Sequence, residues 1–243
     1  MPPGAQGQGI GSRLYEFFLD RLTDHQARRV HAHVREDLHV ARRFVRRRGF
    51  RETGHGDRPS RLEVRSANTE PGRQAAERLE REGIRISTLE ELSGDGEEVL
   101  HGIHELVNET YADIPSSRQW TIMPFDEWQR LRTEAGERPD MVWVAKEGGR
   151  VVGVGTLLQR QESAAYAGHT GVARTHRGRG IARALKHYHV DWARCHSVDY
   201  LFTENDVENV PMLHINAGIG YQPLPTDIEV IRDLGGDEGA ACP

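Results

Sequence analysis

The sequence contains little cysteine, almost no lysine and no long apolar run. Its two cysteines, Cys195 and Cys242, are too few for a disulfide framework or a cysteine-based metal site. No run of 18 apolar residues occurs, and the first residues contain no apolar leader segment. We therefore expect neither a membrane span nor a secretory signal, and we expect a cytoplasmic protein. The net charge of −5 and the pI of about 6.2 argue against a nucleic-acid binder.

The composition that remains is that of an ordinary globular protein. Hydrophobic residues make up 37% of the chain, and there are 26 glycines. This composition excludes a chain that is disordered or collagen-like throughout. The length of 243 residues corresponds to one large domain or one and a half, at roughly 150 residues per domain.

The sequence repeats itself at a fixed offset of 171 residues. Residues 6–11 (QGQGIG) reappear at 177–182 as RGRGIA, and the pair Gly49-Phe50 reappears as Gly220-Tyr221. Both matches share one register without a gap, which chance rarely gives over more than forty residues. We therefore infer a duplication.

The repeat divides the chain into four predicted regions. We expect a partial first domain at 1–66, a linker helix at 67–83, a complete domain at 84–234 and a flexible tail at 235–243. Charge follows the repeat, because residues 1–83 carry 17 basic against 12 acidic residues and residues 84–243 carry 15 against 25. Met1 aligns with Val172, so nothing in the first copy matches residues 84–171. We expect the true start to lie upstream; the alternative is a truncated copy whose open edge pairs with the second copy or another subunit.

Apolar periodicity predicts an α/β protein with a mixed sheet and helices on both faces. Strands are expected at residues 84–88, 141–146, 150–159, 164–172, 198–203 and 229–232. Helices are expected at residues 97–110, 125–135, 180–195 and 207–218. The first copy is expected to contain a helix, a strand at 30–34 and a second helix.

The glycine-rich turn before the helix at Gly180 is the main chemical signal. Gly178 and Gly180 permit close approach of a ligand, and the first N–H groups of the helix have no intrahelical partner. Such a helix start binds anions, a diphosphate among them. A tight turn with solvated arginines is the equally weighted alternative. A dinucleotide-binding site is disfavoured because the third glycine of G-x-G-x-x-G is missing, and a P-loop because Gly-Lys-Ser/Thr is missing.

At these residues the chain resembles the GNAT acetyltransferase superfamily. The family's acetyl-CoA signature, Q/R-x-x-G-x-G/A after the fourth strand, is matched by 177–182 and again by 6–11. The run TENDVENVPMLHINAGIGY, with Asn209 and the final Gly220-Tyr221, resembles the second motif. The resemblance implies a GNAT-like fold and a tandem GNAT protein with an incomplete first copy.

The resemblance also implies a cofactor site and a reaction. Pantetheine would bind the main chain at Val172 and Arg174, diphosphate would bind the N–H groups of 179–182, and a deprotonated primary amine of a small molecule would attack acetyl-CoA directly. No metal is expected. The residues implied for acetyl-CoA binding are Val172, Ala173, Arg174, Arg177, Gly178, Arg179, Gly180, Ile181, Ala182, Asn209 and Met212.

The resemblance also implies groups that transfer protons, and at one of these positions this chain departs from the family. Many family members place a tyrosine, as acid for the departing thiolate, where this chain has Asn216 and the first copy has Val45. A missing acid lowers the rate by about 100-fold or more. Candidate bases are Glu162 and His169, with solvated strand residues as the alternative. We interpret the first copy as non-catalytic.

Acceptor specificity is expected from the loop at 108–124. Its candidate substrate-binding residues are Tyr111, Asp113 and Trp120, where acids and aromatic rings suit a cationic amine; a plain surface loop is the alternative. A non-enzymatic CoA-binding module and a protein-modifying acetyltransferase are the competing functions. Besides the amine, a homodimer partner is possible, and no nucleic acid or membrane partner is expected.

Overall fold

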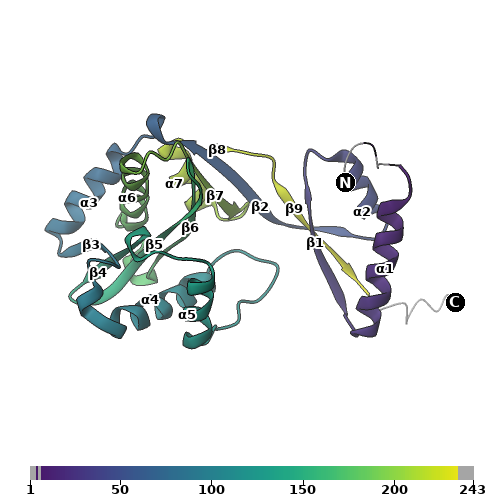
Figure 1. Cartoon of the computed structure of the whole chain (residues 1–243), viewed down its shortest axis with the longest axis horizontal. Coiled ribbons are helices and arrows are strands. Elements are labelled where there is room, and N and C mark those ends of the chain that lie inside the picture. The colour runs from purple at the N-terminus through teal and green to yellow at the C-terminus, as the bar shows by residue number, and fades with distance from the viewer. Residues whose placement is uncertain (1–3, 5–6, 235–243) are drawn as a thin grey trace. The chain divides into compact units, whose positions relative to one another are not determined.

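The computed structural model describes residues 4 and 7–234. The predicted tail at 235–243 and Gln6 of the first signature lie outside these residues. The chain forms two compact units (Figure 1). The first contains the residues up to Gly54 together with those from Asp227 onward, and the second spans His55–Thr226.

A mixed sheet forms the centre of the second unit, as predicted. Its strand order is β2-β7-β6-β5-β4-β3, with β8 also paired to β2. Only β6 and β7 run parallel; the other neighbours are antiparallel. The strands are β2 (Arg51–Glu63, paired with β7 from Asp57 on), β3 (Ile84–Thr88), β4 (Val142–Glu147), β5 (Arg150–Gln161), β6 (Ala164–Val172), β7 (Tyr200–Asp206) and β8 (Gln222–Pro223).

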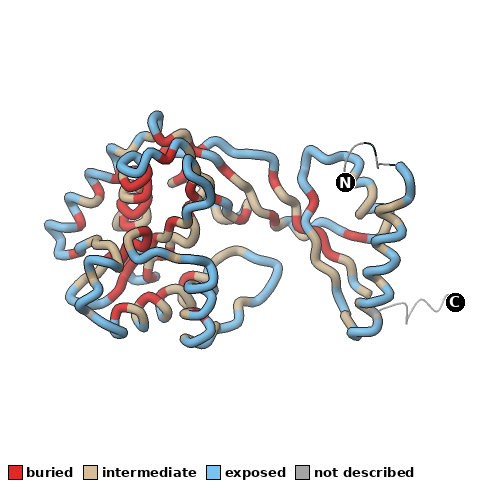
Figure 2. The backbone as a smooth tube through the Cα atoms, viewed as in Figure 1, coloured by how far each residue is buried: buried red, intermediate tan, exposed pale blue. Residues whose placement is uncertain are grey.

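Helices cover both faces of this sheet (Figure 1), and the buried residues lie in its strands and in the helices beside it (Figure 2). One face carries α3 (Glu70–Arg81), α6 (Ile181–Cys195) and α7 (Val210–Ile219), and the other carries α4 (Gly96–Tyr111) and α5 (Phe125–Glu134). The stretch expected as a linker helix forms α3. Its Ala75 and Leu79 are buried in the main core, so α3 is a structural part of this unit.

The first unit contains α1 (Ile10–Asp24), β1 (Arg29–Arg35), α2 (His39–Arg46), the start of β2 and β9 (Asp227–Asp233). β1 and β9 pair antiparallel over seven residues. The offset of 171 relates α1 to α6 and β1 to β7 with the same bounds at both ends. The predicted duplication is therefore repeated in the secondary structure, element by element.

The compact units cut across the sequence repeats because the two copies exchange their final strands. β9 follows α7 in the second repeat, yet it pairs with β1 of the first. β2 follows α2 in the first repeat, yet it pairs with β7 of the second. The division into 1–66 and 84–234 therefore describes the repeat and remains our interpretation of the sequence.

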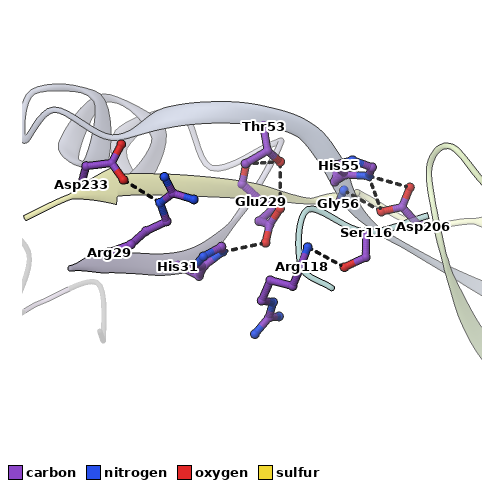
Figure 3. A network of polar contacts seen from close by, with 10 residues as sticks. All are labelled: Arg29, His31, Thr53, His55, Gly56, Ser116, Arg118, Asp206, Glu229 and Asp233. Atoms are coloured by element: carbon purple, nitrogen blue, oxygen red, sulfur yellow. Dashed lines mark hydrogen bonds and ion pairs between the residues drawn. The ribbon is translucent and has the colours of Figure 1, made fainter. Parts of the chain in front are cut away.

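Buried carboxylates hold the long strand β2 within each unit (Figure 3). In the first unit, Thr53 Oγ1 donates to Glu229 Oε2 at 2.9 Å, and His31 Nδ1 lies 3.0 Å from Glu229 Oε1. In the second unit, His55 Nδ1 lies 3.2 Å from Asp206 Oδ2. None of the helices in the described ranges is long and apolar enough to span a bilayer.

Candidate functional site

The site begins where β6 and β7 stop pairing. The two strands pair only through 164–166 and 200–202, and Thr203 Oγ1 then donates to Ala167 O at 2.9 Å. Beyond this point, residues 168–172 of β6 and 204–206 of β7 do not pair with each other; we call these two segments the splay. Their main-chain groups on the facing edges are not used by the sheet.

Val172, a predicted acetyl-CoA ligand, directs its main-chain groups toward the splay. It lies opposite Gly153 of β5, and the next residue, Ala173, donates its N–H to Val152 O at 3.0 Å. Because alternate residues of an antiparallel strand face alternate sides, the N–H and C=O of Val172 point away from β5. Its carbonyl accepts from Arg177 Nε at 3.2 Å, and its N–H is placed to donate to a ligand carbonyl.

The turn from β6 into α6 has the geometry expected of an anion-binding helix start. Gly178 and Gly180 have φ values of 79° and 90°, in the left-handed region that favours glycine. No side chain caps the helix at Gly180. In the described chain, no hydrogen bond uses the N–H groups of 179–182. These groups, with the positive end of the helix dipole, can bind a diphosphate.

The predicted arginines at this turn are compensated by carboxylates. Arg174 and Arg177 both bind Asp113, at 2.6 and 2.5 Å, and Arg179 binds Glu82 and Glu147, each at 3.1 Å. The hydrogen bond from Arg174, followed by that from Arg177, lowers the pKa of Asp113 to about 2. Asp113, a predicted substrate-binding residue, therefore pairs with two of the predicted acetyl-CoA ligands.

The main-chain N–H of Arg174, a predicted pantetheine contact, already has a hydrogen-bond partner. The N–H of Arg174 donates to Glu109 Oε1 at 2.7 Å, so a ligand at this position has to displace that carboxylate. Glu109 was not among the predicted site residues. The available signal was its position only four residues before Asp113, with Glu109 in the last turn of α4 and Asp113 just beyond the end of that helix.

Three aromatic rings form a stack on the α4 side of β6. His169 stacks on Tyr111 at 4.5 Å, and Tyr111 stacks on Trp120 at 4.5 Å. The structure therefore brings together two predicted substrate residues and one predicted base. Trp120 Nε1 also donates to Asn108 Oδ1 at 3.3 Å, and this hydrogen bond fixes the position of the indole ring.

His169 is neutral and its tautomer is determined by Thr110. Thr110 Oγ1 donates to Leu106 O at 2.8 Å, so it accepts from His169 Nε2, also at 2.8 Å. Burial, with a smaller effect of the Lys186 charge, lowers the pKa of His169 to about 4. A side chain of such low basicity is a weak proton acceptor for an ammonium group, whose pKa is about 10.

Three further predicted residues, Glu162, Asn209 and Asn216, lie at different places in the fold. Glu162 is exposed in the turn before β6, on the order of 30 Å along the strand from Val172 at about 3.3 Å per residue, so the two do not meet. Asn209 is the N-cap of α7 and accepts from Met212 N at 3.4 Å, a structural role. Asn216 is buried beside the splay, where its Nδ2 donates to Asn205 Oδ1 at 2.7 Å.

The family comparison agrees with this geometry. The sequence model of the acetyltransferase (GNAT) family matches residues 2–50 and 100–217, more than half of the chain. Both repeats are included in the match. No curated protein matches the chain.

Solved structures with the same fold include tandem GNAT proteins. The chain is similar to a GCN5-related N-acetyltransferase from Sphaerobacter thermophilus, with a TM-score of 0.72 and 20% identity over 96% of this chain and 71% of that one. It is similar to a tandem GNAT protein from the clavulanic acid biosynthesis pathway, with a TM-score of 0.71 and 17% identity over 97% and 73%. It is also similar to a glucosamine N-acetyltransferase region of a fungal multi-domain β-N-acetylglucosaminidase. The TM-score is 0.72 and the identity 16%, over 96% of this chain and 29% of that one. At these identities the likeness shows the fold.

Proposed function

This chain belongs to the acetyltransferase (GNAT) family, and we propose that its second repeat transfers an acetyl group from acetyl-CoA to the primary amine of a small molecule. The observation that carries the proposal is the uncapped start of α6 at Gly180, directly after the strand that ends at Val172. One element offers N–H groups to a diphosphate, and the other offers an N–H to a thioester carbonyl.

The proposed reaction is a direct attack of the amine on the thioester. Acetyl-CoA supplies the thioester, which is reactive enough for direct attack by a neutral amine. The Val172 N–H is placed to stabilise negative charge that develops on the carbonyl oxygen. The N–H groups of 179–182 and the helix dipole hold the diphosphate. Pre-set main-chain donors therefore supply both binding and electrostatic stabilisation.

The aromatic stack supports an amine acceptor on the α4 side of β6. The Trp120 and Tyr111 rings are of the kind that bind ammonium groups through their faces. Residues 84–243 carry 25 acidic against 15 basic residues, which favours the approach of a cation. The Asp113 carboxylate is already paired with arginines, so the rings provide the first contact.

A non-catalytic CoA-binding module is the second candidate, and two observations favour it. Asn216 stands where the resemblance expects an acid, and the N–H of Arg174 is occupied by Glu109. Such a module would bind acetyl-CoA without turnover.

Two measurements on the full chain separate these functions. Calorimetric titration with acetyl-CoA reports binding, and a thiol-release assay over a panel of primary amines reports transfer. We expect saturable binding and release of CoA thiol above the rate of hydrolysis for at least one amine. Binding without release favours the module, and absence of binding contradicts both candidates.

A further inference from the structure

Three buried polar side chains and the half-buried Asn205 lie together on α6, on β7 and at the end of α7. Lys186, Asn216 and Tyr221 are 1%, 2% and 4% exposed. Asn216 Nδ2 donates to Asn205 Oδ1 at 2.7 Å, the N–H of Tyr221 donates to Asn216 O at 3.1 Å, and Lys186 Nζ lies 5.6 Å from the centre of the Tyr221 ring. We call Lys186, Asn205, Asn216 and Tyr221 the polar cluster.

The polar cluster is not internally satisfied. Asn216 Oδ1 and the Tyr221 hydroxyl are buried without a hydrogen-bond partner. Within the described part of the chain, no carboxylate forms an ion pair with Lys186. An unpaired buried charge and unpaired buried polar atoms destabilise a fold. Packing alone therefore does not explain this set of residues.

The first repeat provides an internal control for the same place in the fold. The offset of 171 relates Lys186, Asn205, Asn216 and Tyr221 to Tyr15, Val34, Val45 and Phe50. These four residues belong to one hydrophobic cluster of the first unit, in which the Tyr15 and Phe50 rings lie 6.2 Å apart. Apolar residues fill the position there without loss of the helix–strand–helix arrangement. The helix–strand–helix arrangement therefore does not itself require a lysine and two asparagines at these positions, and a ligand would explain why the second repeat has them.

The polar cluster borders the splay. Asn205 lies on β7 past the last residue that pairs with β6, on the strand that faces Val172. On the opposite segment of β6, Thr170 Oγ1 is also buried without a partner. Asn205 therefore joins the polar cluster to the splay, and the Lys186 charge acts on His169 of the same β6 segment, where it helps to lower the pKa of that histidine.

We propose that the polar cluster holds the reacting end of acetyl-CoA and that the Lys186 ammonium donates its proton to the departing CoA thiolate. This inference rests on the proposed function. The amine lone pair forms the C–N bond, the C–S bond breaks, and its electron pair goes to sulfur. A proton from Lys186 Nζ completes the CoA thiol, the surplus proton of the amine leaves to water, and water reprotonates Lys186. Lys186 thereby takes the role for which Asn216 has no acidic proton.

The acidity of Lys186 is suited to this step. Burial lowers the pKa of Lys186 to about 8, close to the value of about 8.5 for an ordinary thiol. Three buried titratable groups near it have pKa values that are shifted away from that of Lys186. Burial lowers the pKa of His189 well below its usual value and that of His169 to about 4, and it raises the pKa of Tyr221. Loss of the Lys186 proton therefore produces a falling rate above about pH 8.

Lys186→Met is the decisive variant. Its matched control is Lys146→Met, which removes the chain's second lysine, on β4. We expect Lys186→Met to keep or raise the melting temperature, to change acetyl-CoA affinity less than threefold, and to lower thiol release about 100-fold. The alkaline decline of the rate should disappear. Lys146→Met should behave as wild type in all four measurements.

Lys186→Arg separates proton donation from positive charge alone. Arginine keeps the charge but does not give up its proton, so release should stay low although acetyl-CoA still binds. Release by Lys186→Met within threefold of wild type, or equal release by Lys186→Arg, overturns the inference while leaving the proposed function intact. A melting temperature of Lys186→Met well below that of wild type would indicate a structural lysine and also overturn it. A wild-type chain that binds no acetyl-CoA overturns both proposals.

Discussion

The two repeats share the same glycine turn but differ in what surrounds it. Gly7 and Gly9 have φ values of 78° and 75°, and their counterparts Gly178 and Gly180 have 79° and 90°. Each turn opens a helix of the same length. The second turn follows β6, whereas no strand precedes the first among the described residues. The local sequence motif therefore determines the backbone of the turn in both repeats, and the proposed thioester site also needs the edge of β6.

The two repeats also differ in the side chains at equivalent positions around the turn. The first signature has glutamines at the positions where the second has Arg177 and Arg179. Where the second repeat has a lysine, two asparagines and a tyrosine in the polar cluster, the first has a tyrosine, two valines and a phenylalanine. The comparison shows that the two repeats share secondary structure while their side chains at the proposed site differ. Substitutions that exchange features between the repeats test this view.

The largest effect is expected at the glycine turn. Gly180→Val places a branched side chain at φ 90°, with its Cβ 2.9 Å from Arg78 Nη2, whereas the Cβ of Gly9→Val meets nothing within 4 Å. Left-handed backbone alone costs a non-glycine residue about 1–2 kcal/mol. We expect Gly180→Val to weaken acetyl-CoA binding about 100-fold and Gly9→Val to leave it unchanged. Calorimetric titration of both variants measures the difference; equal loss in both would remove the distinction between repeats.

An exchange of the buried residues is expected to have opposite consequences in the two repeats. The double variant Asn205→Val with Asn216→Val removes both partners of one hydrogen bond, which is nearly neutral for stability, and should slow transfer about tenfold. Val34→Asn in the first repeat buries an amide in an apolar cluster and should cost about 1–3 kcal/mol without effect on transfer. Urea unfolding and thiol release together measure this. A stable Val34→Asn protein would argue against the internal control.

The sequence predicts local features of the structure well and long-range contacts poorly. The strands at 84–88 and 164–172 were predicted with their observed bounds, because apolar period and flanking turns are local signals. The family and the mixed α/β fold are confirmed. The exchange of β2 and β9 between the repeats could not be predicted, because the hydrophobic pattern of a strand does not determine which other strand it pairs with. The pairing of Arg174 with Asp113, 61 residues apart, was hidden for the same reason.

Trp120 tests the acceptor side of the second repeat. Removal of its ring in Trp120→Ala exposes the Tyr111 face and removes one surface for an ammonium group. We expect the KM for the amine to rise about tenfold, equivalent to about 1.4 kcal/mol, with little change in kcat or in acetyl-CoA affinity. Steady-state kinetics with the best amine provide the measurement. A fall in acetyl-CoA affinity instead would assign Trp120 to the donor site.

The smallest effect is expected from Asp113→Asn, which releases Arg174 and Arg177 at the second turn. Partly exposed ion pairs contribute about 0–1 kcal/mol, so acetyl-CoA affinity should rise about threefold, less at high salt. The pKa of Asp113, lowered to about 2, makes its stabilisation complete above the ordinary carboxyl pKa and lost as pH falls through about 2. The melting temperatures of wild type and variant should differ equally from pH 5 to 9 and converge between about pH 4 and 2. A constant gap through pH 2 would contradict the lowered pKa.

The most direct test follows backbone amide resonances of both turns during titration with acetyl-CoA. We predict large, saturable shifts for the N–H groups of Val172 and of 179–182, and none for the equivalent N–H groups of 8–11. Unchanged resonances at 179–182, or equal shifts at both turns, would contradict the assignment of the donor site to the start of α6.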